Sequence, residues 1–199
     1  MNIGVLALQG GFAEHIASLN GTGRATCREI RKRADFTGDL DGLVIPGGES
    51  TVMANLLRDL DLLQPIRDAI RRGMPAMGTC AGLILLSADV EDFSRPTIGL
   101  LDVSVTRNAY GRQLDSFRTR GVFAETRHVP MVFIRAPGIV RLGPGVLPLA
   151  SGGGRVVAVR QDRLLATAFH PELTEDATVH DYFLDMAAAA AHHPAEAAQ

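Results

Sequence analysis

Apolar runs and amphipathic segments alternate along the first half of the chain. Residues 3–8 and 43–45 are short apolar runs that end at glycine-containing turns, which is the pattern of buried strands. Residues 12–19 lie between these runs and place apolar side chains at helical spacing on one face. This part of the chain therefore predicts buried strands joined by helices.

The same alternation continues to residue 88. We expect a helix that begins at Ser50 or Thr51, with one of these hydroxyls as its cap, and reaches about Leu57. The pattern then predicts a helix over 62–72 that Gly73 ends, a strand over 74–78 and a helix over 81–88. Strand, turn and helix in regular repetition predict an α/β fold: a three-layer, doubly wound, mainly parallel sheet with helices on both faces.

Short strands dominate the second half of the chain. We expect them over 101–107, 129–134, 155–160 and 164–169, as antiparallel additions at an edge of the sheet. A last helix is expected over 174–191. Residues 1–191 would then form a single domain, and residues 192–199 a disordered tail.

The segment 20–41 fits this alternation poorly. The order of the sheet calls for a buried strand here, yet only Ala25, Cys27 and Ile30 are apolar in the stretch RATCREIRK. We predict a strand in this stretch only because the order of the elements requires one.

Composition narrows the class of protein. With 199 residues, 46% of them hydrophobic, the chain is long enough for one domain with a sizeable core. A net charge of −2 argues against a nucleic-acid-binding protein, which carries a basic excess. Two cysteines are too few for a disulfide framework, no apolar run is long enough to span a membrane, and the first residues lack the basic start of a signal peptide. We therefore expect a cytoplasmic protein, and the sequence holds no metal cluster and no cofactor motif.

A single cysteine lies between two glycines where a predicted strand meets a predicted helix. In the stretch GTCAG, Cys80 would occupy a sharp turn at the carboxyl edge of the sheet, where open α/β folds place their sites. The helix N-terminus would favour the thiolate form, and the N–H group of Ala81 would point at a developing oxyanion. A buried structural cysteine is the commoner fate of a lone thiol, so this pattern alone leaves both interpretations open.

A thiol nucleophile needs a base and a group that orients the base. His170 follows the last apolar strand in AFHPEL, and Glu172 stands two residues on. Residues two apart in an extended chain point to the same side, so we expect the Glu172 carboxylate to orient the His170 imidazole. The alternative is a surface pair in water, against which the presence of GTCAG argues. His15, His128 and His180 lack such settings, and we expect them to be structural or solvated.

The stretch IPGGES ends the predicted strand over 43–45. It lacks the spacing of a phosphate-binding P-loop. Its glycine pair can expose backbone N–H groups, so we expect Gly48 to supply the second donor of an oxyanion hole beside Cys80. Glu49 can bind the amino group of a substrate.

Three stretches in this order, PGGES, GTCAG and HPE, resemble the class I glutamine amidotransferases. GVLALQG, GLVIPGGEST, GTCAGLILL, VTRNAYGRQLDSF, VFIRAP and ATAFHPELT are similar to one branch, the glutaminase subunits of pyridoxal 5′-phosphate synthase, over nearly the whole chain. The resemblance implies a flavodoxin-like fold of the class I glutamine amidotransferase type. The departure is the segment 20–41, where relatives have a Val-rich strand and this chain is polar and rich in arginine.

The resemblance also implies the chemistry. Cys80 attacks the side-chain amide of L-glutamine, His170 moves the proton to the leaving ammonia, and Glu172 orients His170. The N–H groups of Gly48 and Ala81 hold the oxyanion. The glutamine-binding residues implied by position are Gly47, Gly48, Glu49, Arg107, Ile134 and Arg135, and Gln9 would lie near the oxyanion side. The two guanidinium groups suit a carboxylate, although an arginine on an edge strand is more often simply solvated.

The same resemblance also implies a partner protein. Ammonia would pass to a (β/α)8-barrel synthase subunit that builds pyridoxal 5′-phosphate from ribose 5-phosphate and glyceraldehyde 3-phosphate, in an assembly of twelve glutaminases and twelve synthases. Two alternatives stay open: a glutaminase that feeds another synthase, such as imidazole glycerol phosphate synthase, and a non-catalytic regulatory subunit of the same fold. The stretches RNAYGRQ and FIRAP argue against the first, and the intact Cys80, His170 and Glu172 argue against the second.

Overall fold

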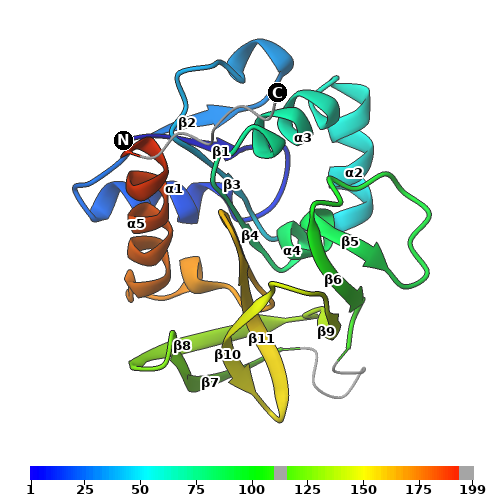
Figure 1. The fold of residues 1–199 in the computed structure, drawn as a ribbon, viewed down its shortest axis with the longest axis vertical. Helices are drawn as coiled ribbons and strands as arrows, with labels where there is room; N and C mark the ends of the chain where they lie inside the picture. Colours follow the sequence, from blue (N-terminus) through cyan, green and yellow to red (C-terminus); the bar gives the residue numbers. More distant parts are fainter. Residues whose placement is uncertain (110–115, 193–199) are drawn as a thin grey trace.

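The structure of the chain is a computed structural model that describes residues 1–109 and 116–192 (Figure 1). Its centre is formed by five parallel strands: β1 (Asn2–Leu6), β2 (Thr26–Ile30), β3 (Gly42–Ile45), β4 (Ala76–Thr79) and β12 (Leu164–Thr167). They pair in the order β2-β1-β3-β4-β12. This is the order of flavodoxin-like sheets, so the predicted doubly wound fold is confirmed. All residues of β3, β4 and β12 are buried, as expected of strands with helices on both faces.

Helices cover both faces of these strands. On one face lie α1 (Phe12–Gly21) and α5 (Thr178–His192), and on the other α2 (Ser50–Asp59), α3 (Leu63–Arg71) and α4 (Ala81–Leu86) (Figure 1). The described residues also form two 3-10 turns, η1 (Arg33–Asp35) and η2 (Pro171–Leu173). None of the helices found in residues 1–109 and 116–192 has the length and apolar character needed to cross a membrane.

All five predicted helices are present, with bounds that differ from the predicted ones by one to four residues. α4 ends two residues early, because the Ser87 hydroxyl donates a hydrogen bond to the Leu83 carbonyl oxygen (2.7 Å) and the backbone turns into β5 (Ser87–Val90). α5 begins at Thr178 rather than residue 174, and the Asp176 side chain accepts a hydrogen bond from the Thr178 N–H group (2.9 Å) at its start. It continues through His192, one residue into the predicted tail. Residues 193–199 lie outside the described residues, as do residues 110–115, which include the last four residues of the RNAYGRQ stretch.

The polar segment 20–41 does contain a strand. β2 runs parallel to β1 at the edge of the sheet, and Ile30 is its one buried residue. Arg28 in this strand forms an ion pair with the exposed Asp39 (2.9 Å). An edge strand that faces water needs few apolar side chains, which explains why its hydrophobic pattern is weak.

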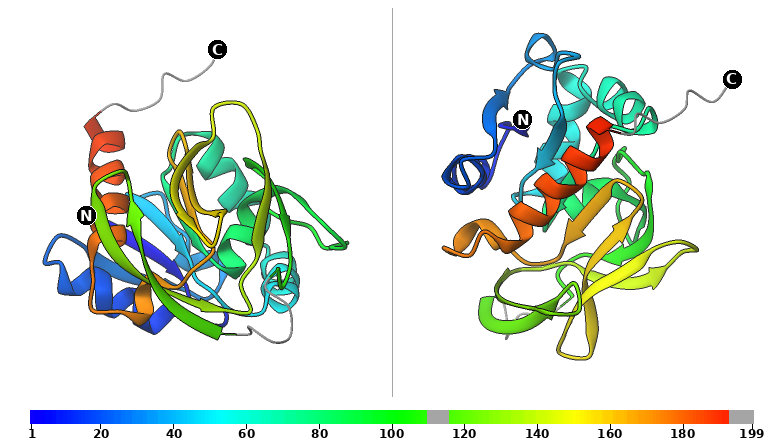
Figure 2. Two further views of the ribbon diagram at one scale, coloured as in Figure 1. Left: turned by 90° about the horizontal axis from the view of Figure 1, so that it is seen from below. Right: turned by 60° about the vertical axis from the view of Figure 1, so that its left-hand side comes forward.

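The second half of the chain extends the sheet beyond β12. The added strands are β11 (Arg155–Gln161), β10 (Leu147–Gly152), β7 (Ser116–Phe123) and β8 (Arg127–Ile134), each antiparallel to its neighbour. They fill the lower part of the molecule in Figure 1 and again lie below most of the helices in the right-hand view of Figure 2. A separate three-stranded sheet contains β5, β6 (Leu101–Thr106) and β9 (Gly138–Leu142).

Two predictions for this half are wrong. The strand predicted over 164–169 is β12, which is parallel to β4 and lies inside the sheet. The strand predicted over 101–107 is β6, which belongs to the small sheet. In both cases a short apolar run shows that a strand is buried but carries no information on which neighbour it pairs with.

One hydrophobic core joins the two halves of the molecule. The fully buried Phe133 of β8 packs against Phe169, which directly precedes His170, with ring centroids 5.9 Å apart. The backbone N–H group of His170 donates a hydrogen bond to the Val132 carbonyl oxygen (2.8 Å). The core therefore fixes the end of β12 against β8, where the site described next is built.

Candidate active site

A cavity of about 230 Å³ opens where the carboxyl ends of the parallel strands face the antiparallel part of the molecule. Its lining residues are Gln9, Gly48, Glu49, Ser50, Cys80, Ile84, Arg107, Asn108, Ile134, Arg135 and His170. Most of the site residues predicted from the sequence are thus brought together. The other three, Gly47, Ala81 and Glu172, are buried directly behind this lining.

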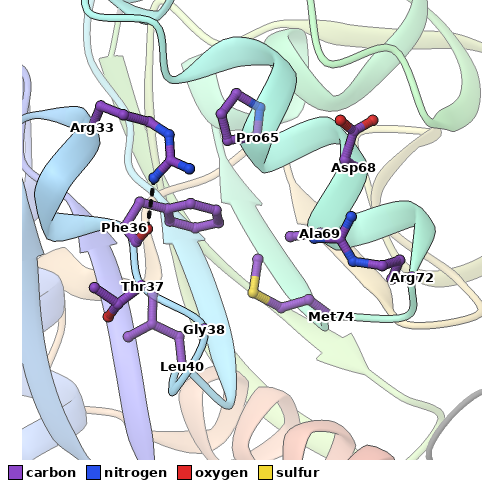
Figure 3. A pocket seen from close by; sticks show the side chains of 10 residues that line it. All are labelled: Arg33, Phe36, Thr37, Gly38, Leu40, Pro65, Asp68, Ala69, Arg72 and Met74. Atoms are coloured by element: carbon purple, nitrogen blue, oxygen red, sulfur yellow. Dashed lines mark hydrogen bonds between the residues drawn. The ribbon is translucent and has the colours of Figure 1, made fainter.

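A larger cavity, of about 510 Å³, lies elsewhere, between the segment 33–40 and α3 (Figure 3). Arg33 and Phe36 border it on one side, and Arg72 and Met74 on the other. None of the predicted site residues lines it, and neither does any cysteine or histidine. Volume alone therefore does not mark the reactive part of this molecule.

Cys80 occupies a strained turn between β4 and α4. Its backbone has φ +50° and ψ −100°, a conformation that residues other than glycine rarely adopt. The turn brings α4 so close to β4 that a Cβ atom on Gly78 would lie 2.6 Å from the backbone of Gly82. The close approach of helix and strand therefore explains the two glycines that flank the cysteine. The Cys80 thiol faces the Ile134 carbonyl oxygen at 3.8 Å.

His170 and Glu172 form a buried hydrogen-bonded pair. His170 Nδ1 lies 2.7 Å from Glu172 Oε1. The extended backbone predicted between them is wrong, because Pro171 begins η2 and this tight turn folds Glu172 back against the imidazole. His170 Nε2 is buried without a hydrogen-bond partner among the described residues. With Nδ1 held by the carboxylate, Nε2 is the nitrogen available for a reacting proton.

The electrostatics of this pair favour a proton on His170. Burial of the ring opposes the charged form, yet Cys80 beside the ring and the hydrogen-bonded Glu172 carboxylate outweigh burial and raise the pKa of His170 to about 10. Burial opposes the Glu172 carboxylate as well, but His15 and His170 beside it lower its pKa. At neutral pH the pair is therefore an imidazolium and a carboxylate. A protonated histidine beside a cysteine is the arrangement that supports a thiolate.

Two histidines that sequence reasoning left aside lie behind this pair. His15 of α1 and His180 of α5 are both fully buried, and His15 Nε2 is 3.3 Å from Glu172 Oε2. His128 of β8 is exposed, as expected. His15 and His180 belong to the expected structural class, but their place beside the carboxylate was not predicted. Helical periodicity gives no signal for it, because their partner comes from a distant part of the chain.

The PGGES loop passes directly beside the thiol. A Cβ atom on Gly47 would lie 3.4 Å from Cys80 Cβ. Two hydrogen bonds hold the loop: the Gly11 N–H donates to the Gly47 carbonyl oxygen (3.1 Å), and the Glu49 N–H donates to Gln9 Oε1 (2.7 Å). Gly48 lies between these anchors and lines the cavity. Gln9 is therefore on the PGGES side of the site, where it was predicted.

Ala81 is the first residue of α4. The N–H groups of the first helical turn have no acceptor within their own helix. The two predicted oxyanion donors, the N–H groups of Gly48 and Ala81, thus come from the PGGES loop and from the first residue of α4, on either side of Cys80.

Glu49 has a role in the fold that the sequence did not reveal. It caps α2, with its carboxylate accepting hydrogen bonds from the N–H groups of Thr51 (3.0 Å) and Val52 (2.8 Å). The predicted cap, Ser50 or Thr51, is therefore wrong, because the longer side chain of the preceding residue reaches the same N–H groups. Burial opposes the charged carboxylate, but these N–H groups and the neighbouring Arg107 lower the pKa of Glu49.

The two predicted carboxylate-binding arginines lie on the opposite wall of the cavity. Arg107 Nη2 is 3.5 Å from Glu49 Oε1, and its guanidinium carbon lies 5.2 Å from the centre of the Phe93 ring. Arg135 is exposed at the end of β8, with φ +42°. The cavity thus offers a carboxylate and two guanidinium groups around one thiol, which is the charge pattern of a site for an amino acid.

Comparisons with known proteins agree with this geometry. The model of the SNO glutamine amidotransferase family matches residues 5–189. The chain belongs to this family. It is 53% identical over 188 residues to the "Pyridoxal 5′-phosphate synthase subunit PdxT" of Methanocorpusculum labreanum, across 94% of this chain and 98% of that protein. It is 48% identical over 189 residues to the PdxT protein of Streptococcus pneumoniae, across 94% and 97%.

Solved structures support the same family. A crystal structure of a glutamine amidotransferase, 42% identical in sequence, superposes with a TM-score of 0.89 across 94% of this chain and 98% of that one. The structure of PurLQS from Thermotoga maritima, 16% identical, superposes with a TM-score of 0.67 across 92% of this chain and 97% of that chain. The second likeness concerns the fold alone. The expected class I glutamine amidotransferase fold is confirmed.

Proposed function

We propose that this chain is the glutaminase subunit of a pyridoxal 5′-phosphate synthase and that Cys80, His170 and Glu172 are its catalytic residues. The observation that carries the subunit assignment is the identity of about half of the residues to named PdxT proteins over 94% of the chain. The observation that carries the triad is geometric: a cysteine in a strained turn just before α4 shares one cavity with a histidine held by a buried glutamate.

The reaction begins with attack of the Cys80 sulfur on the side-chain amide carbon of L-glutamine. The N–H groups of Gly48 and Ala81 stabilise the negative charge on the amide oxygen. His170, protonated through its raised pKa, gives its Nε2 proton to the leaving nitrogen, and ammonia departs from a glutamyl thioester. The now neutral His170 takes a proton from water, the hydroxide attacks the thioester, and glutamate leaves with the sulfur restored as thiolate and His170 as imidazolium.

Glutamine is held by the groups that surround the thiol. Glu49 accepts hydrogen bonds from the α-amino group, while Arg107 and Arg135 bind the α-carboxylate. Gly47, Gly48 and Ile134 contribute the backbone of the pocket. Five of these six residues line the cavity, and Gly47 lies directly behind Gly48. A glutamine bound in this way presents its side-chain amide to Cys80 between the two oxyanion donors.

Ammonia made here passes to a (β/α)8-barrel synthase subunit, which combines it with ribose 5-phosphate and glyceraldehyde 3-phosphate. The assembly contains twelve glutaminases and twelve synthases. The names of the PdxT relatives support the pathway, and this subunit requires no cofactor for the steps above. A cytoplasmic location is part of the same proposal and agrees with the two free cysteines of the chain.

Amide-labelled glutamine tests the proposal directly. The full chain is incubated with [amide-15N]glutamine, first alone and then with a purified barrel synthase and its two sugar phosphates. We expect glutamate to form, and 15N to appear in pyridoxal 5′-phosphate only when both subunits are present. Label in an imidazole glycerol phosphate product with that synthase would establish the first alternative. No glutamate with any partner would establish a regulatory subunit without turnover.

A further inference from the structure

Two buried histidines, hydrogen-bonded to each other, lie next to Glu172 on the side away from His170. His15 Nε2 lies 3.3 Å from Glu172 Oε2 and 3.0 Å from Thr79 Oγ1. On its other side, His15 Nδ1 lies 3.0 Å from His180 Nε2. The two rings meet edge to face, with centroids 5.2 Å apart, and neither is exposed to solvent. The reaction steps described above use neither ring.

The chemistry of the carboxylate fixes the direction of these hydrogen bonds. Glu172 is ionised and repels a lone pair, so the His15 nitrogen that faces it at 3.3 Å, Nε2, carries the proton and donates its hydrogen bond to Thr79 Oγ1. Burial lowers the pKa of both His15 and His180, the latter to about 3, so each ring is neutral and carries a single N–H. His15 Nδ1 must then accept, and His180 Nε2 must donate. His180 Nδ1 is accordingly a buried nitrogen without a hydrogen-bond partner among the described residues.

We propose that His15 is a positioning residue for the catalytic carboxylate and that His180 fixes the tautomer in which His15 can act. The proposal rests on the triad assigned under the proposed function. Glu172 Oε1 is hydrogen-bonded to His170 Nδ1 at 2.7 Å. Glu172 Oε2 has no hydrogen-bond partner among the described residues, and the N–H group of His15 lies against it at 3.3 Å, where it opposes rotation of the carboxylate. His170 is thereby kept in the orientation that leaves its Nε2 for the reaction.

Placement in the fold supports this role. His15 comes from α1 and His180 from α5, the two helices on one face of the sheet, whereas Glu172 lies in η2. Two neutral imidazoles are poor core residues, because each buried polar group needs a partner. Their hydrogen-bond partners here are Thr79 and each other, and His15 also lies against the catalytic carboxylate. A leucine would fill the same space without this demand, so packing alone does not explain the pair.

Kinetics of His15 variants test the proposal on the full chain in complex with its synthase. His15→Leu removes the donor and keeps most of the volume. We expect kcat for glutamine hydrolysis to fall about tenfold to a hundredfold, because the buried carboxylate loses the one N–H group described beside its Oε2 atom. KM should stay within about twofold of the wild-type value, since His15 does not line the cavity. His15→Gln, whose amide can donate from a similar position, should recover most of the loss.

A double-mutant cycle separates positioning from general stability. If His15 acts through the carboxylate, His15→Leu should have little further effect on kcat in a Glu172→Gln background. Ser87→Ala is the matched control, because Ser87 is fully buried and hydrogen-bonded to Leu83 but is not part of this chain of contacts. It should keep the wild-type kcat. If His15→Leu does not fold, His180→Phe replaces it, and a lower kcat at constant KM is again expected.

Three results would overturn the positioning role: a wild-type kcat in His15→Leu, a full additional loss in the Glu172→Gln background, or no recovery in His15→Gln. The parallel variant Cys80→Ala distinguishes this failure from failure of the triad. If Cys80→Ala is inactive while His15→Leu is fully active, the triad stands and only the inference on His15 is wrong. If Cys80→Ala remains active, the proposed mechanism itself is wrong.

Discussion

The two walls of the cavity hold their side chains in different ways. On the wall built from the parallel strands, Cys80, His170 and Glu172 are 6%, 8% and 5% exposed and are fixed by a strained turn and a buried hydrogen bond. On the wall built from β6 and β8, the Arg107 side chain is 33% exposed and Arg135 is open to solvent. Groups that exchange protons and bonds need fixed geometry, whereas groups that capture a charged substrate must be reachable from water.

The largest expected difference between the walls is in the rate of the reaction itself. Cys80→Ala removes the nucleophile and should lower kcat by about four orders of magnitude or more. Cys27→Ala should keep most of the activity, because Cys27 lies on the edge strand β2 and burial raises the pKa of its thiol to about 11. Steady-state glutamate formation with saturating synthase measures both. Equal losses in the two variants would contradict the assignment of the nucleophile.

Within the buried wall, loss of the residue that carries the proton should lower kcat/KM more than loss of the residue that orients it. His170→Asn removes the group that transfers the proton, whereas Glu172→Gln leaves the imidazole in place. We expect Glu172→Gln to retain about tenfold to a hundredfold more activity, as in other triads where the base and its orienting carboxylate are compared. The measurement is kcat/KM at saturating synthase. An equal or reversed order would show that the two roles are assigned wrongly.

The close packing of α4 against the neighbouring strands at the Cys80 turn should contribute measurably to the free energy of unfolding. Gly82→Ala places a Cβ atom against the Ile45 carbonyl oxygen, a backbone atom that cannot move aside. We expect a loss of about 3 kcal/mol or more in the free energy of unfolding. Gly38→Ala is the matched control, because a Cβ atom there has open space, and it should change the free energy by about 0.5 kcal/mol or less. Urea unfolding followed by circular dichroism gives both values, and equal stabilities of the two variants would contradict tight packing of α4 at the Cys80 turn.

The exposed wall should affect binding and leave the chemistry almost intact. Arg107→Ala removes one guanidinium group from the substrate carboxylate and also its contact with Glu49. We expect KM for glutamine to rise about tenfold, with kcat changed by about twofold or less. Arg127→Ala, an exposed arginine of β8 outside the cavity, should leave both parameters unchanged. A fall in kcat with constant KM in Arg107→Ala would place Arg107 among the reacting groups and remove the distinction between the walls.

The same contrast decides what could be predicted from the sequence. β3 and β4 are covered on both faces, so their continuous apolar runs identify them. β7 and β10 show mostly exposed residues, and their pattern gave no signal. Ile30 alone is buried in β2, which therefore could be placed only from the order of the elements. Strand pairing was the least predictable feature, because it depends on contacts between distant parts of the chain.

The site residues also differ in how far the sequence could predict them. The glycines around Cys80 and the HPE stretch are local patterns with a local physical cause, and the sequence led to Cys80, His170 and Glu172 through them. The partners of His15 come from β4, η2 and α5, which only the fold brings together. Glutamate is also an uncommon helix cap, so composition did not point to the role of Glu49 at α2.

The central claim is that Cys80 forms the covalent intermediate, and covalent labelling tests it most directly. The full chain, bound to its synthase, is treated with a glutamine analogue that carries a diazoketone in place of the side-chain amide, and is then analysed by peptide mass spectrometry. The account predicts one adduct per chain, on Cys80, which excess L-glutamine suppresses and Cys80→Ala abolishes. An adduct on Cys27 in place of Cys80, or undiminished turnover of a chain fully labelled at Cys80, would contradict it.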